Sequence, residues 1–314
     1  MTTAVSKLEF TALDAEAVGR LMADFRAARS PHTLRAYEAD LAAFATHAGA
    51  STVGDAVREL LSAGPGAANS AVLRYKDRLL TDELAPATIN RRLAALRSVV
   101  RVARLVGLIT WSIEIPGLRT TPYRDTRGPG RAGFQRLVQL AADQAEPKRS
   151  RDLAILWLLY GRALRREEIA SLDLEHLDMV GARVRVMGKH RREREWLTVP
   201  PATIRSLAEW LAVRGDSQGP LFHRVDRAAA MAGDRGRLTA KSIERLVSDL
   251  GKRLGLRVRP HGLRHAAITE VLDVTRGDFR TTQRFGRLQS ANVLRFYDDN
   301  REDLGGEASR LIAP

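Results

Sequence analysis

The sequence predicts a mainly α-helical protein with a small β-hairpin or sheet in its C-terminal half. Three observations support this fold class. Apolar residues recur at helical spacing through the first half, most clearly from 86 to 105. The run Leu153–Tyr160 (LAILWLLY) is apolar on nearly all sides, as in a helix at the centre of a core. Between 183 and 199 the apolar period changes from about 3.6 to 2, which indicates two strands.

The N-terminal half is expected to be helical. Ser30 and Pro31 favour a helix start, because serine caps free N–H groups and proline fits the first turn. Gly49 ends that helix, and the sequence Ser62–Gly66 (SAGPG) separates the next two. The predicted helices, after a loose start, cover 31–48, 53–61, about 68–80 and 86–105.

The helix predicted at 86–105 carries charge beside its apolar stripe. The stripe consists of Ile89, Leu93, Leu96, Val100 and Ala103. Arg97, Arg101 and Arg104 lie on a neighbouring stripe, which would either follow a DNA backbone or be a solvated face. The positive charge of the whole chain favours contact with DNA.

Residues 115–130 differ in composition from their surroundings. Proline and glycine recur there among arginines, which predicts a linker. The glycines Gly128, Gly130 and Gly133 fit the spacing GxGxxG, but no strand precedes them, so the linker composition explains them better than a dinucleotide site. We therefore expect a helical domain at 1–118, a linker at 119–130 and a second domain at 131–314.

The second domain is expected to combine helices with the hairpin. Val184 and Val186 alternate with arginines, and Leu197 and Val199 continue the alternation after a turn expected at His190–Glu193. The predicted helices cover 133–143, 151–160, 163–169, 201–213, 239–254, 261–272 and part of the final stretch.

The composition limits the classes of function. The chain of 314 residues has 51 Lys+Arg against 37 Asp+Glu, a net charge of +14 at pH 7. This excess favours a polyanionic partner, nucleic acid before a membrane surface, over a protein that is merely basic.

The absence of cysteine excludes disulfides and thiolate chemistry. No apolar run approaches the roughly 20 residues of a membrane helix. The N-terminus lacks the layout of a signal peptide, so we expect a cytoplasmic protein without a membrane partner.

Two pairs of polar residues at helical spacing are candidates for a phosphate site. His261 and Arg264 stand three residues apart in Pro260–His265 (PHGLRH) and would share a helix face. Arginine binds phosphate oxygens with a planar set of donors, and histidine exchanges a proton near neutral pH. Glu168 stands three residues after Arg165 and would fix its rotamer. The alternatives are a structural histidine with a surface arginine, and a routine surface ion pair.

Lys189 and Tyr297 are further candidates. Lys189 follows Gly188 at the end of a strand, and it would either donate a proton in a groove or only touch phosphates. Its surroundings do not fit a P-loop. The basic residues that follow it are His190, Arg191 and Arg192. Tyr297 lies where an apolar segment meets a polar one, so by itself it is either an edge residue or a nucleophile.

In their order along the chain, these residues resemble the tyrosine recombinases of the phage integrase family. The matching segments of the second half are 164–169 (LRREEI), 188–189 (GK), 261–265 (HGLRH) and 295–297 (RFY). In the first half, the segments 30–37 (SPHTLRAY) and 86–93 (PATINRRL) are similar to that family's core-binding domain. The resemblance implies an N-terminal helical core-binding domain, which clamps DNA, followed by an α+β tyrosine-recombinase catalytic domain.

Two positions depart from the family pattern. A histidine or tryptophan usually stands nine residues before the tyrosine, where this chain has Leu288. Leucine packs against the tyrosine segment but cannot donate to a phosphate oxygen, so we expect a reduced rate with an unchanged reaction type. The family's glycine two residues before the first arginine is Ala163, a change expected to be minor.

The resemblance implies a site-specific DNA recombinase or integrase that acts through a 3′-phosphotyrosine. Tyr297 would attack the phosphodiester, and Arg165 and Arg264 would hold its non-bridging oxygens. His261 would act as the acid–base partner near Tyr297. Lys189 would protonate the leaving 5′-oxygen.

The resemblance also implies the partners. Glu168 and His265 would support the site, and no metal or other cofactor is expected because side chains supply the positive charge. Double-stranded DNA is the expected partner, with a homotetramer on two DNA sites and the tail 305–314 docked on a neighbouring subunit. The short N-terminus favours a simple two-domain recombinase. The alternatives are a type IB topoisomerase and a DNA-binding protein with an impaired catalytic site.

Overall fold

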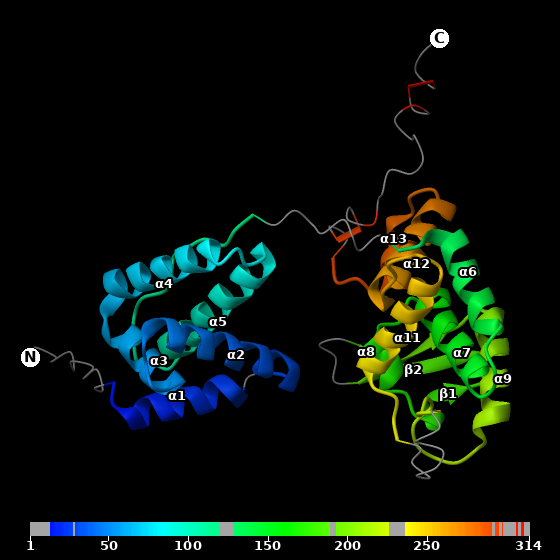
Figure 1. Cartoon of the computed structure of the whole chain (residues 1–314), viewed down its shortest axis with the longest axis horizontal. Helices are drawn as coiled ribbons and strands as arrows, with labels where there is room; N and C mark the ends of the chain where they lie inside the picture. The colour runs from blue at the N-terminus through cyan, green and yellow to red at the C-terminus, as the bar shows by residue number, and fades with distance from the viewer. Residues whose placement is uncertain are drawn as a thin grey trace, which may run out of the picture. The chain divides into compact units, whose positions relative to one another are not determined.

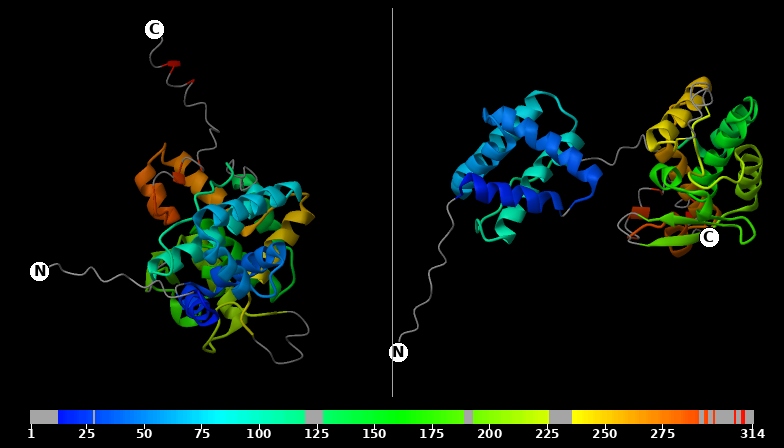
Figure 2. Two further views of the ribbon diagram at one scale, coloured as in Figure 1. Left: turned by 90° about the vertical axis from the view of Figure 1, so that its left-hand side faces the viewer. Right: turned by 90° about the horizontal axis from the view of Figure 1, so that it is seen from below.

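The chain forms two compact units, Met1–Thr121 and Pro122–Pro314, in the computed structural model (Figures 1 and 2). The residues that the structure describes are 13–27, 29–119, 128–188, 193–225, 236–290, 293–294, 297, 306 and 309–310. Most of the predicted linker at 119–130 and of the predicted hairpin turn at His190–Glu193 lies outside these residues.

The first unit consists of five helices within its described residues. They are α1 (Ala15–Ala27), α2 (Pro31–Ala48), α3 (Val53–Ser62), α4 (Gly64–Thr81) and α5 (Pro86–Leu105). Ser30 caps α2 by accepting a hydrogen bond from the Thr33 N–H, and Gly49 ends it at φ 71°, as predicted. Helix α1 was not predicted. Helix α4 begins earlier than predicted because Gly64, at φ 76°, turns the chain sharply.

Helix α5 has the bounds and the buried face that its sequence predicted. All five residues of the apolar stripe are at most 1% exposed. They belong to one apolar core that includes side chains from α1 to α4. The helical prediction for this unit is therefore confirmed.

The second unit packs helices around α7 and α12, beside a small antiparallel sheet. Its helices are α6 (Gly130–Ala142), α7 (Lys148–Gly161), α8 (Arg166–Ala170), α9 (Pro201–Arg214), α11 (Ala240–Arg253), α12 (Pro260–Val274) and α13 (Phe279–Gly286). The strands β1 (Leu177–Asp178), β2 (Arg183–Met187) and β3 (Arg194–Thr198) follow one another across the sheet, as Figure 1 shows in part. The predicted hairpin is confirmed, with Val184 opposite Leu197, and β1 is an additional strand.

Two differences from the predicted helices bear on the site. The helix predicted at 163–169 begins only at Arg166, because Ala163 takes φ 50° and turns the chain. Helix α12 is buried along most of its length, between α6, α7, α11 and α13. Within the described ranges, no helix has both the length and the apolar character of a membrane crossing.

Candidate active site

Arg165 and Glu168 are held together at the start of α8. Arg165 is the extended residue that precedes the helix, and its main-chain N–H donates to Glu168 Oε2 at 2.8 Å. Its Nη1 donates to Oε1 of the same carboxylate at 2.9 Å. The predicted contact is thus present. Because Glu168 is only 4% exposed, the pair is not the routine surface ion pair considered above.

Arg287 binds the same carboxylate from the opposite side. It caps the C-terminus of α13 at φ 48°, and its Nη1 and Nη2 donate to the two oxygens of Glu168 at 3.1 and 2.5 Å. Burial by itself would raise the pKa of Glu168. The hydrogen bonds and charge of Arg287 outweigh burial, with help from Arg165, and the pKa ends below its ordinary value. One ionised carboxylate therefore joins α8 to α13 through two guanidiniums. Sequence reasoning missed Arg287.

Arg264 is fixed inside the core by carbonyl groups. Its side chain is almost fully buried, and its Nη1 and Nη2 donate to the carbonyl oxygens of Ala163 and Gly286. Burial lowers the pKa of Arg264 to about 10, with a further contribution from the charge of Arg165. The guanidinium therefore remains charged at neutral pH. The left-handed turn at Ala163 directs the carbonyl oxygen of this residue toward Arg264. Glycine adopts such a turn without strain, which explains the glycine that similar sequences have where this chain has Ala163.

His261 lies in the first turn of α12, one turn before Arg264. The residue keeps a solvent-exposed surface at the mouth of a pocket. Neighbouring protein displaces part of the water around the imidazole, and the charges of Arg264, His265 and Arg165 add to this effect. All of them lower the pKa of His261. The neutral imidazole, which can accept a proton, is therefore favoured at pH 7.

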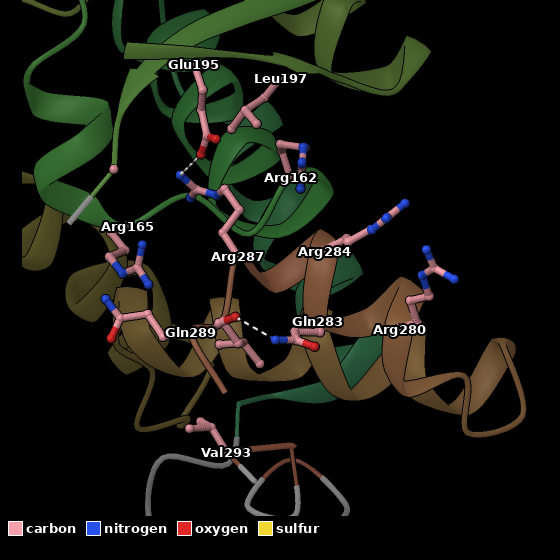
Figure 3. A pocket seen from close by; sticks show the side chains of 12 residues that line it. Arg162, Arg165, Glu195, Leu197, Arg280, Gln283, Arg284, Arg287, Gln289 and Val293 are labelled. Carbon is pink, nitrogen blue, oxygen red and sulfur yellow. Dashed lines mark hydrogen bonds and ion pairs between the residues drawn. The ribbon is translucent and has the colours of Figure 1, made fainter. Parts of the chain in front are cut away.

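The two predicted arginines and the histidine face a single pocket. Arg165, His261 and Arg264 line a cavity of about 300 Å³, together with Arg166, Arg259 and two carboxylates, Glu167 and Glu244. Arg165 also lines a larger cavity of about 840 Å³, shown in Figure 3. Arg166 is ion-paired with Glu167 and Glu244. The other three arginines, together with the imidazole, can bind an anion and exchange a proton with it.

Tyr297 lies against α12, but it does not line either cavity. The residue is 7% exposed, and its side chain packs with Ala267 and Ile268. The centroid of the Tyr297 ring is 4.6 Å from that of His265. The main-chain carbonyl oxygen of Tyr297 accepts a hydrogen bond from Thr269 Oγ1 at 2.9 Å. The charge of the phenolate would raise the pKa of Arg264, which places the two groups within electrostatic range of each other.

Comparison with known proteins identifies the family. A family model described as phage integrase family matches residues 133–302, and one described as phage integrase, N-terminal SAM-like domain, matches 25–106. A tyrosine recombinase of Synechococcus elongatus is 36% identical over 324 aligned positions, which cover 100% of this chain and 99% of that protein. The chain belongs to the phage integrase family.

Other members of the phage integrase family show the same relationship. A tyrosine recombinase of Synechocystis is 35% identical, with 91% of each chain covered, and XerC of Haemophilus ducreyi is 28% identical over 86% of this chain and 88% of its own. The fold is that of the Tn1549 transposon integrase in complex with transposon right end DNA. The TM-score is 0.67 at 15% identity, and 96% of this chain and 100% of that chain are covered.

Leu288 occupies the position where the integrase family usually has histidine or tryptophan. Its side chain is half-buried and packs against the cluster that contains Tyr297, as the sequence predicted. Gln283 fixes the main chain here: its carbonyl oxygen accepts from the Leu288 N–H at 3.0 Å, and its Nε2 donates to the Leu288 carbonyl oxygen at 3.1 Å (Figure 3). Leu288 therefore supplies packing and no side-chain donor.

Some predicted site residues are not brought to this centre. Lys189, His190, Arg191 and Arg192 lie outside the described residues, although Gly188 lines the larger cavity. In the first unit, Arg101 and Arg104 are exposed on α5. Arg97 has a structural contact that was not predicted, since its Nη2 donates to the Ile115 carbonyl oxygen at 2.6 Å.

Two other sequence features have local explanations. Gly128 precedes α6, where an added Cβ would collide with the Gly262 carbonyl oxygen of α12, so close packing requires glycine there. Asp173, Glu175 and His176 lie within metal-ligand reach of one another. Because Arg237 pairs with Asp173 and the Asp173 N–H donates to His176 Nδ1 at 2.9 Å, we interpret this group as a local capping network.

Proposed function

We propose that this integrase-family chain is a site-specific DNA recombinase that cuts and rejoins strands through a 3′-phosphotyrosine at Tyr297. The observation that carries the proposal is the convergence of Arg165, Arg264 and His261 on one pocket. Relatives that are 36% and 35% identical are named tyrosine recombinases, and the Tn1549 integrase was solved with DNA. A backbone phosphate of double-stranded DNA is the ligand that best matches this charge.

In the proposed reaction, Tyr297 Oη attacks the phosphorus and its proton passes to the neutral imidazole of His261. Arg165 and Arg264 bind the non-bridging oxygens, where negative charge increases in the transition state. The bond from phosphorus to the 5′-oxygen breaks, and Lys189 gives that oxygen a proton. Rejoining reverses these steps on a second 5′-hydroxyl, so no external energy source is needed.

The supporting residues have separate tasks in this scheme. Glu168 holds the Arg165 guanidinium in place, and His265 packs against the nucleophile's ring. Because the Tyr297 ring is packed against α12, we propose that the tyrosine segment moves toward Arg264 when DNA enters. Breaking the hydrogen bond from Thr269 Oγ1 to the Tyr297 carbonyl oxygen would release the segment.

We further propose the domain division 1–118, 119–130 and 131–314, with the two domains closing around a duplex in the cytoplasm. Phosphate contacts by the exposed Arg101 and Arg104 would contribute to affinity, which makes binding depend steeply on salt. Four chains on two DNA sites would complete the recombination reaction, with the tail of each chain docked on its neighbour.

A DNA-binding protein with an impaired site is the second candidate, and one observation favours it. Leu288 offers no donor where the family usually has one. In that case the purified chain would bind DNA and form no covalent product. A type IB topoisomerase, by contrast, would relax supercoiled DNA without joining two sites.

The DNA that the purified chain retains is first sequenced, and a duplex with that sequence is then synthesised for the experiment. A nick placed just 3′ of the cleavage position lets the short fragment that carries the new 5′-hydroxyl diffuse away. The covalent product is thereby trapped and migrates as a shifted band on a denaturing gel. Wild type is expected to give this band and Tyr297→Phe is not, while both bind the duplex. Tyr160→Phe, which alters a part-buried tyrosine of the same unit, is the control that keeps the band. A covalent band from Tyr297→Phe would refute the assignment.

A further inference from the structure

The larger cavity has a strongly positive lining. Among the described residues, its wall contains five arginines and one carboxylate, Glu195. The arginines are Arg162, Arg165, Arg280, Arg284 and Arg287. With a volume of about 840 Å³, the cavity is far larger than one phosphate group needs. The proposed chemistry uses only Arg165 from this set.

The carboxylates near this cavity already have cationic partners. Glu168 accepts from Arg165 and Arg287, and Glu195 lies 3.9 Å from Arg287 Nη1. Arg162 donates to the Phe285 carbonyl oxygen at 2.7 Å, and Glu195 and Glu168, which already pair with other arginines, are the carboxylates whose charge acts on it. Five arginines of the cavity wall therefore share two carboxylates, Glu168 and Glu195, so the described part of the chain leaves the cavity with surplus positive charge.

Arg280 and Arg284 stand out within this set. Both are exposed, and neither has a side-chain hydrogen bond or salt bridge to any described residue. They lie four residues apart on α13, so they share one face of the helix. Like charges one turn apart destabilise a helix, and the carboxylate of Asp278, the N-cap of α13, offsets this repulsion only at the Arg280 end. An anion bound between them would remove this cost.

The three arginines surround one part of the cavity. Figure 3 shows Arg280 and Arg284 extending from α13 along one side, with Arg162 nearby at the end of α7. Burial lowers the pKa of Arg162, and the charge of Arg287 lowers it further. Both effects mean that an anion here would stabilise the charged guanidinium.

The position of Arg165 connects this cavity to the proposed reaction site. Arg165 lines both cavities, so they adjoin at this residue. Successive phosphates of a DNA strand follow one another at about 3.4 Å of axial rise. A strand with one phosphate at Arg165 therefore has its next phosphates within reach of the larger cavity.

We infer that Arg280 and Arg284, with Arg162, form a second phosphate site that binds the DNA backbone beside the phosphate held at Arg165. The inference rests on the proposed function for the identity of the ligand. The site fixes the strand on one side of the reacting phosphorus. It thereby positions the scissile phosphate without contacting the reacting atoms.

The test is the salt dependence of binding to a 30-base-pair duplex of arbitrary sequence. Each phosphate contact that is lost reduces the slope of log K against log salt by about 0.9. Arg280→Gln/Arg284→Gln is therefore expected to reduce the slope by about this amount, while Arg280→Lys/Arg284→Lys retains it. The control Arg136→Gln/Arg205→Gln removes two charges from exposed positions on α6 and α9 outside both cavities, and it should leave the slope unchanged.

An unchanged slope in the Gln pair would overturn the inference, and so would an equal reduction in the control pair. The two arginines are exposed, so the variants are expected to fold, and thermal melting followed by circular dichroism checks this. The covalent trapping assay is run on the same preparations. If wild type gives no covalent band while the slopes differ as expected, the proposed function fails and the phosphate site stands.

Discussion

Glu168 is the residue whose replacement should disturb the site most. Its carboxylate is 4% exposed and accepts hydrogen bonds from Arg165 and from both Nη atoms of Arg287, whose side chain is 8% exposed. Glu168→Ala leaves the Arg287 charge buried without its counterion. Removing one partner of a buried ion pair costs about 3–5 kcal/mol. We expect the free energy of unfolding of the second unit to fall by about this amount.

A double-mutant cycle separates the ion pair from the packing. Arg287→Ala removes the other partner, and Glu168→Ala/Arg287→Ala removes both charges together. The double variant should cost less than the sum of the single variants, with a coupling energy near the upper end of the usual range of roughly 0.5–3 kcal/mol. The reason is that no orphaned charge remains inside the protein.

The assay is urea unfolding followed by tryptophan fluorescence. Of the four tryptophans, Trp111 alone lies in the first unit, so a Trp111→Phe background reports the second unit. The control is Glu167→Ala on the same helix, where the side chain is 60% exposed and pairs with Arg166 at the surface. This control should cost less than about 1 kcal/mol. A cost for Glu168→Ala that does not exceed that of Glu167→Ala would refute the reasoning.

Three further predictions follow from the same contacts. The pKa of Glu168 lies below its ordinary 4.5. The contribution of its charge to stability is therefore present above pH 4.5 and is lost as pH falls through the lower pKa of the folded state. In Glu168→Gln, the urea midpoint should accordingly change less with pH between pH 6 and 3 than it does in wild type. The pKa of His261 lies below 6.5, so single-turnover cleavage should decline only below pH 6.5, and a decline centred above that value would contradict its role as base. Gly128→Ala should destabilise the second unit by about 1–3 kcal/mol in urea because its Cβ meets the Gly262 carbonyl oxygen, and an unchanged urea midpoint would contradict this contact.

The sequence predicted the helices whose apolar faces are regular and whose ends carry strong signals. Helix α5 matched its predicted bounds because one apolar stripe runs between a proline start and the end of the periodicity. Helix α1 was not predicted, although its start carries a capping residue, since Asp14 Oδ1 accepts from the Ala17 N–H at 2.7 Å. The start of α8 was placed too early because a helical pattern of residue types does not reveal the left-handed turn at Ala163.

The site was predicted from residue order and assembled by tertiary contacts. The pairs Arg165–Glu168 and His261–Arg264 are local in sequence, so their spacing could be interpreted directly. Arg287 could not be found in this way, because its partner Glu168 is 119 residues away and the sequence offers many other arginines. Arg280 and Arg284 become notable only once α13 is known to border the cavity that contains Arg165.

The central claim is that Arg165 and Arg264 neutralise one phosphate at the moment of attack by Tyr297. The most direct test replaces the scissile phosphate of the nicked duplex with a methylphosphonate, in which one charged oxygen becomes a neutral methyl group. On the ordinary duplex, Arg264→Ala should give no covalent band. On the methylphosphonate, the account predicts that the same variant regains a substantial part of the wild-type band, whereas a variant equally inactive on both duplexes would contradict it.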